Sequence, residues 1–164
     1  MDETQAQLAA AGAIALWAAA VTPSLVQHDL REFRLPNRLT LPGWWVAAGA
    51  LAVVTPLTGQ FPTSAALTAL ILLVVLVAVA LTGGLGMGGV KLVLPLAVGL
   101  LLVHPQTALV AAMLALCSGA IVALGTVIQQ RNLRAHIPFG PPILLGYWTG
   151  YTWSATGILP GILP

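Results

Sequence analysis

The chain has 164 residues, a formal net charge of +2 and a composition that is 59% hydrophobic and only 6% charged, with a mean hydropathy of +0.97. Soluble domains carry about a quarter charged residues, and six lysines and arginines cannot supply a polar outer face for a chain of this length. The composition therefore excludes a soluble domain and predicts an all-α, polytopic integral membrane protein.

Long apolar runs bounded by proline, glycine or charge predict the membrane spans. At about 20 residues per span, the chain has room for about six transmembrane helices, so we expect a single domain over residues 1–164. The first run lacks a preceding basic segment and is too long for the apolar part of a signal peptide, so we expect it to be a helix of the domain. In chain order the expected spans are 6–28, 40–57, 63–82, 89–103, 106–129 and 142–158, the fourth being short.

The four acidic residues are the most informative set, because none of them follows Glu32. Asp29 comes directly after the first apolar run, in VQHDLREFRLPNRLTLP, so we expect it at the end of the first helix near the membrane surface. An ionisable residue near bilayer depth is a functional candidate, and the alternative is an ion pair with Arg31 or Arg34 at the water interface. Pro23 is expected to kink the helix and to help aim its Asp29 end.

Basic residues are confined to alternate loops, whereas the other connections, TGQFPTS and HPQT, and the tail ILPGILP contain no lysine or arginine. The basic residues are Arg31, Arg34, Arg38, Lys91, Arg131 and Arg134. Because basic loops stay in the cytoplasm, this pattern predicts that both termini lie outside. We expect a multi-pass protein of the cell inner (plasma) membrane.

Side chains that bind metals or form disulfides are scarce in this chain. Cys117 is the single cysteine and falls in the middle of the fifth span, where we expect it to act as a small packing residue. His104 and His136 fall in loops without metal-ligand spacing to other cysteine, histidine or acidic residues. We therefore expect no metal and no cofactor.

A glycine cluster, GGLGMGGVKL, interrupts the apolar sequence at residues 83–92. Gly86 and Gly88 lack a β-carbon, so their backbone can adopt φ > 0 and pass close to another segment. Lys91 is expected at the same cytoplasmic level, where its side chain can reach lipid headgroups. Two interpretations remain open, a tight turn between closely packed helices and a groove that binds a peptide.

The sixth span contains a second glycine pattern, in which Gly146 and Gly150 have Gly-x-x-x-Gly spacing. This spacing allows helix backbones to approach closely. We expect the pair to serve packing within the molecule rather than a homodimer contact.

Three stretches on the predicted cytoplasmic side occur in an order that resembles the type IV prepilin peptidase family, membrane aspartic peptidases of the Gly-x-Gly-Asp type. In residues 29–40 an aspartate precedes a short basic segment that ends in Leu-Pro-Asn and Leu-Thr. GMGGVKL at 86–92 resembles the Gly-x-Gly-Asp-Val-Lys-Leu motif, and IPFGP at 137–141 matches a late Ile-Pro-Phe-Gly-Pro segment. Larger members carry an additional N-terminal segment with Cys-x-x-Cys motifs, associated with methylation, so this chain resembles the short members that consist of the peptidase core.

The resemblance implies that Asp29 is one catalytic aspartate and that Gly89 stands at the position of the other. An aspartic peptidase needs two carboxylates, because one takes a proton from water while the other, protonated, polarises the scissile carbonyl. Loss of one member of such a unit costs on the order of 10^4 to 10^6 in turnover. We therefore expect the peptidase architecture with little or no cleavage, in either a naturally degenerate member or a chain whose aspartate was exchanged.

Two other groups could replace the missing carboxylate. Glu32 shares a helix face with Asp29, but a dyad must converge on one water from two supports, and Glu32 is expected to pair with Arg31 or Arg34. The other is a second Asp29 across a homodimer, and the oligomeric state stays open.

The resemblance also implies a substrate and its partners. An active member would be an endopeptidase that cleaves the leader of a type IV pilin-like precursor at the cytoplasmic membrane face, with Gly86, Gly88 and Lys91 in contact with the substrate. Membrane lipids are expected partners and nucleic acids are not. Two alternatives are a non-catalytic pilin-binding or assembly subunit of a pilus or secretion system, and a small transporter, which would place polar groups near the membrane midplane.

Overall fold

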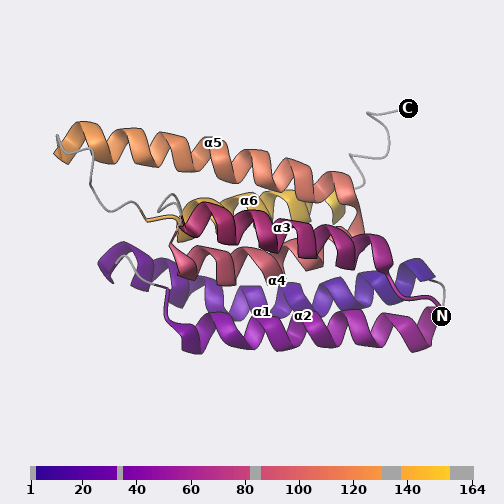
Figure 1. The fold of residues 1–164 in the computed structure, drawn as a ribbon. Helices are drawn as coiled ribbons and strands as arrows, with labels where there is room; N and C mark the ends of the chain where they lie inside the picture. Colours follow the sequence, from indigo (N-terminus) through magenta and orange to yellow (C-terminus); the bar gives the residue numbers. More distant parts are fainter. Residues whose placement is uncertain (1–2, 33–34, 82–85, 131–137, 156–164) are drawn as a thin grey trace.

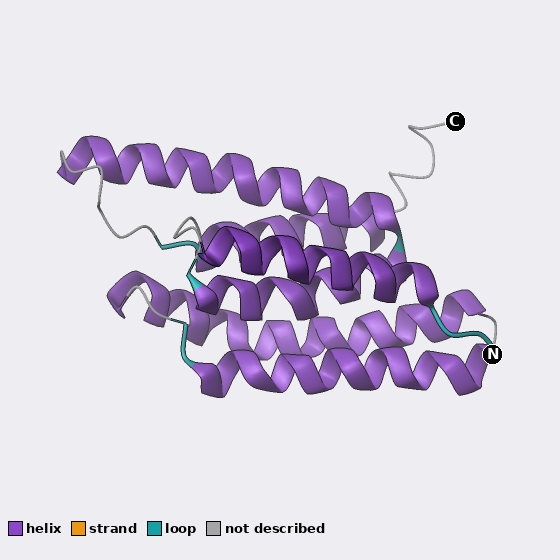
Figure 2. Ribbon diagram, viewed as in Figure 1, coloured by secondary structure: helices purple, strands orange, loops and turns teal. Residues whose placement is uncertain are grey.

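The computed structural model describes residues 3–32, 35–81, 86–130 and 138–155, and the regular structure within these ranges is all α-helical (Figure 2). Successive helices run in opposite directions (Figure 1). The helices are α1 Glu3–Glu32, α2 Asn37–Thr58, α3 Thr63–Leu81, α4 Met87–Val103, α5 Pro105–Gln130 and α6 Gly140–Ala155. Each predicted span corresponds to one helix, which confirms the helical membrane bundle.

Four helices, α1, α2, α3 and α5, are long and apolar enough to cross a membrane, and α4 is a shorter apolar helix. The predicted bounds are correct to within a few residues. The largest difference at the start of the chain is that α1 continues to Glu32. Asp29 therefore lies in the last turn of α1, at the helix end where it was expected, and the helix passes through Pro23 without ending there.

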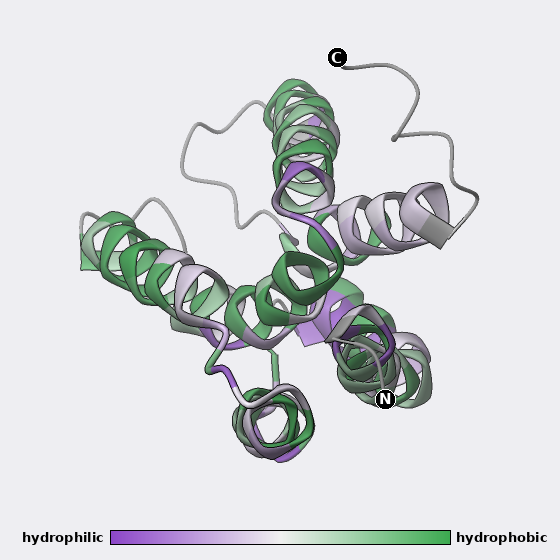
Figure 3. Ribbon diagram, turned by 90° about the vertical axis from the view of Figure 1, so that its right-hand side faces the viewer, coloured by the Kyte–Doolittle hydropathy of each residue, from purple (hydrophilic) through white to green (hydrophobic). Residues whose placement is uncertain are grey.

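Helix α4 lies in the middle of the bundle and packs against each of the other five helices (Figure 3). Every residue from Leu96 to Leu102 is buried. A helix that is apolar on all sides is stable when other helices surround it. This central position explains why α4 contains almost no polar side chain along its length.

Helices α3 and α5 lie at the periphery and expose large apolar side chains, among them Ile71 and Val74 of α3 and Leu116 and Ile121 of α5. In a membrane these side chains face lipid. Cys117 is exposed on α5, so the expectation that it packs inside the protein is wrong. The physical reason is that α5 packs mainly against α4 and α6 and leaves its other face uncovered.

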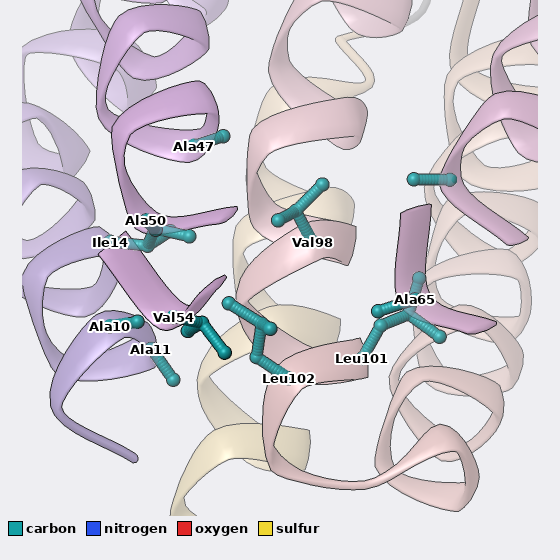
Figure 4. Packing of buried hydrophobic residues seen from close by; sticks show 11 residues of the cluster. Ala10, Ala11, Ile14, Ala47, Ala50, Val54, Ala65, Val98, Leu101 and Leu102 are labelled. Atoms are coloured by element: carbon teal, nitrogen blue, oxygen red, sulfur yellow. The ribbon is translucent and has the colours of Figure 1, made fainter. Parts of the chain in front are cut away.

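One of the two core clusters joins α1, α2, α3 and α4 through small residues (Figure 4). Alanines predominate on α1 and α2, and larger side chains come from α4. Small side chains let helix backbones approach closely, which is the main source of packing energy between helices in lipid. The labelled members are Ala10, Ala11, Ile14, Ala47, Ala50, Val54, Ala65, Val98, Leu101 and Leu102.

Helices α5 and α6 pack closely through the glycine pair of α6. A β-carbon on Gly146 would collide with the carbonyl oxygen of Ala111 and approach Ala115, and one on Gly150 would lie 2.8 Å from the β-carbon of Ala111. Both contacts are within one chain, which confirms the predicted intramolecular packing.

We predict that Gly146→Ala lowers the free energy of unfolding by about 1–3 kcal/mol, because an added methyl group in a tight contact forces the backbone to shift. The measurement is unfolding of the purified protein in detergent. Gly125→Ala is the matched control, since Gly125 is also helical and a β-carbon there meets nothing within 4 Å. Equal stability of the two variants would contradict close packing at Gly146.

Candidate active site

The residues identified from the sequence gather at one end of the bundle, where α1 ends and α2, α4 and α6 begin (Figure 1). Leu25, Leu92 and Leu144 belong to one core cluster. Each of them lies about one helical turn further into the bundle than Asp29, Gly89 and Gly140, respectively. The three positions therefore lie at the same end of the bundle, on three different helices that meet in this cluster.

Asp29 is a buried carboxylate with only 4% of its surface exposed. Its Oδ2 accepts a hydrogen bond of 2.7 Å from the backbone N–H of Gly140, the first residue of α6. Arg31 is exposed, and Arg34 lies outside the described residues. Among the described residues the polar partner of Asp29 is thus the start of α6, which the sequence analysis did not predict.

Gly140 also contacts the Asp29 side chain directly. A β-carbon at position 140 would lie 2.9 Å from Oδ2 and 3.2 Å from Cγ of Asp29. Real β-carbons essentially never approach so closely, so this contact requires glycine. The sequence signal that could have identified Gly140 is the Gly-Pro-Pro run, because proline is favoured in the first turn of a helix.

The glycine cluster forms the start of α4. Gly86 is the N-cap, with φ of −68° and ψ of 145°, and its carbonyl accepts the N–H of Gly89 at 2.9 Å. The predicted left-handed backbone is wrong for Gly86 and Gly88, since Gly59 is the one described glycine with positive φ. An extended N-cap followed by a regular helical turn needs no positive φ.

Close approach, the second expectation for these glycines, is observed at Gly88. A β-carbon there would lie 3.0 Å from the β-carbon of Leu35, just before α2. Gly89 is buried in the first turn of α4. The observed contact is therefore between the start of α4 and the segment that leads into α2.

Lys91 connects the same two elements. Its Nζ donates a hydrogen bond of 2.9 Å to Oδ1 of Asn37, and its backbone carbonyl accepts a hydrogen bond of 3.0 Å from Nε1 of Trp44. Lys91 thus has protein partners on α2 that the sequence did not reveal. Contact of Lys91 with lipid headgroups or with a substrate stays a prediction.

Glu32 does not share the surroundings of Asp29. Its side chain is exposed, whereas that of Asp29 is buried one turn earlier on the same helix. A carboxylate that faces outward is badly placed to share a water with a buried one. Within residues 3–32, 35–81, 86–130 and 138–155, no group of three or more metal-ligating side chains is found.

Helix α6 is tied to α1 a second time, deeper in the bundle. Nε1 of Trp148 donates a hydrogen bond of 3.1 Å to Oγ1 of Thr22. The Thr22 hydroxyl in turn donates a hydrogen bond of 2.7 Å to the carbonyl oxygen of Ala18. Thr22 precedes Pro23, so this contact and the bond to Asp29 hold α6 along the last part of α1.

The type IV leader peptidase family matches residues 9–124, which include Asp29 and the glycine cluster and end within α5. No curated protein and no solved structure matches the chain. Because the matched residues are more than half of the chain, it belongs to the type IV leader peptidase family.

Proposed function

We propose that this protein is a prepilin peptidase scaffold that binds a type IV pilin-like precursor at the cytoplasmic face of the inner membrane and cleaves its leader poorly or not at all. Family membership supports a prepilin-peptidase-like function and a pilin-like partner in general. The observation that carries the proposal is the buried carboxylate of Asp29, which lies at the same end of the bundle as the buried Gly89.

The distribution of charge supports a cytoplasmic location for this end of the bundle. Within the described part of the chain, the basic residues Arg31, Arg38 and Lys91 all lie at the end of the bundle that contains Asp29. Lysine and arginine near the ends of spans favour the cytoplasm. In this orientation the opposite ends of α1 and α6 face outward.

The proposed loss of activity follows from the chemistry of the dyad. Peptide hydrolysis by an aspartic enzyme uses one ionised and one protonated carboxyl group that act on the same water and carbonyl. Asp29 supplies one such group, and the first turn of α4 supplies a glycine where the family has the other. Glu32, being exposed, offers no replacement on the described geometry.

The transporter alternative is weaker because, among the described residues, no charged side chain lies at mid-depth in the bundle. A groove between α2, α3 and α4 is lined only by apolar side chains. The described charged residues lie within the first two turns or the last turn of their helices. A transporter site is expected near the midplane instead.

We predict that Gly89→Asp creates or greatly increases cleavage of a pilin-like precursor, because it restores the second carboxylate. The precursor is incubated in liposomes with one of three chains: the unaltered chain, Gly89→Asp or Asp29→Asn/Gly89→Asp. The released leader is measured by mass spectrometry. The expected gain is on the order of 10^4-fold or more, and the double variant returns to background.

Two results would contradict this prediction. Cleavage by the unaltered chain at the rate of Gly89→Asp would show that another group completes the dyad. If Gly89→Asp folds but does not cleave the precursor, the proposal that the chain is a peptidase scaffold lacking one carboxylate is wrong.

We further predict that the unaltered chain retains the precursor in detergent, because precursor binding does not depend on the missing carboxylate. Co-purification of tagged precursor is the measurement, and an unrelated single-span membrane protein of equal length is the control. Retention together with an inactive Gly89→Asp chain would favour the non-catalytic pilus or secretion subunit. Equal recovery of precursor and control would contradict binding.

A further inference from the structure

The first turn of α6 leaves one backbone N–H without a partner inside the helix. The first four N–H groups of a helix normally lack such partners. In α6, however, Pro141 and Pro142 have no N–H. The N–H of Ile143 donates a hydrogen bond of 3.2 Å to the carbonyl oxygen of Phe139. The N–H of Gly140 is the remaining donor, and Asp29 accepts it.

The carboxylate and the helix start also match electrostatically. The N-terminus of a helix carries a partial positive charge of about half an elementary charge, which stabilises a nearby anion. A hydrogen bond to an ionised carboxylate is about twice as strong as one between neutral groups. Because Asp29 is buried, its side chain has few other positions available once this bond has formed.

We propose that Gly140 is the positioning residue of Asp29: its N–H holds one carboxylate oxygen, and its missing β-carbon leaves the space that the carboxylate occupies. The contact joins residues 111 positions apart and includes a glycine beyond the matched residues 9–124. The start of α6 thus fixes the direction in which the Asp29 carboxylate points. The effect on cleavage rests on the proposed function, whereas the holding of the carboxylate does not.

The first experiment tests the contact in the chain as it is, without reference to activity. The amide proton of Gly140 is observed by NMR in 15N-glycine-labelled protein, with Asp29→Ala and Glu32→Ala as variants. Loss of the acceptor moves the Gly140 amide proton upfield and speeds its exchange in Asp29→Ala. Glu32→Ala removes an exposed carboxylate from the same helix turn and leaves the signal in place. An unchanged Gly140 signal in folded Asp29→Ala would overturn the proposal.

The second experiment tests the consequence for cleavage in the Gly89→Asp background. Gly140→Ala keeps the N–H but displaces Asp29, so kcat is expected to fall about 100-fold, the cost of a displacement of about 1 Å. KM is expected to stay the same, because Gly140 acts through Asp29 and not on the precursor. Gly125→Ala is the matched control and leaves both constants unchanged.

The outcomes separate the two proposals. Unchanged kcat in folded Gly140→Ala/Gly89→Asp would overturn the positioning role. If Gly89→Asp itself does not cleave, the proposed function fails, and the amide signal still decides whether Gly140 holds Asp29. The amide experiment leaves Gly140 intact, so it also decides the question if Gly140→Ala does not fold.

Discussion

The burial of α4 on all sides is the constraint on which the rest of the structure depends. A helix that touches five others and is buried from Leu96 to Leu102 cannot carry a polar side chain along that stretch without a large desolvation cost. Polar chemistry is therefore restricted to the ends of α4. At its first turn Gly88 meets Leu35 and Lys91 meets Asn37, so the position of Gly89 is fixed by contacts with the start of α2.

Burial also gives Asp29 a role in helix packing besides its proposed role in catalysis. A buried carboxylate is tolerated when it is hydrogen-bonded, and here the bond links the end of α1 to the start of α6. Asp29 therefore contributes to helix packing whether or not the chain cleaves anything, and its presence alone is no sign of activity. For this reason the informative substitution adds a carboxylate at Gly89, since removing Asp29 would disturb structure and chemistry together.

Much of the fold could be predicted because apolar runs and their interruptions determine where membrane helices begin and end. It was harder to predict which face of each helix is buried. Helix α5 is apolar nearly all round, so nothing in its sequence showed that Cys117 is exposed. The contacts between residues of the candidate site could not be predicted from the sequence either. Lys91 and Asn37 are 54 residues apart, and Gly140 acts through a backbone N–H, which any residue except proline possesses. Its importance depends on the two prolines that follow and on the side chain that it faces.

The contact between Gly140 and Asp29 changes which part of the chain the chemistry depends on. The family match ends in α5 and contains Asp29 and Gly89, the two positions proposed for the aspartate pair, yet the described polar partner of Asp29 lies in α6. A chain with both aspartates but a larger residue at the start of α6 would have to move the carboxylate or the helix, because a β-carbon there would lie 2.9 Å from Oδ2. In the proposed mechanism hydrolysis needs carboxylates on both α1 and α4, and the contact at the start of α6 determines where the first of them is held.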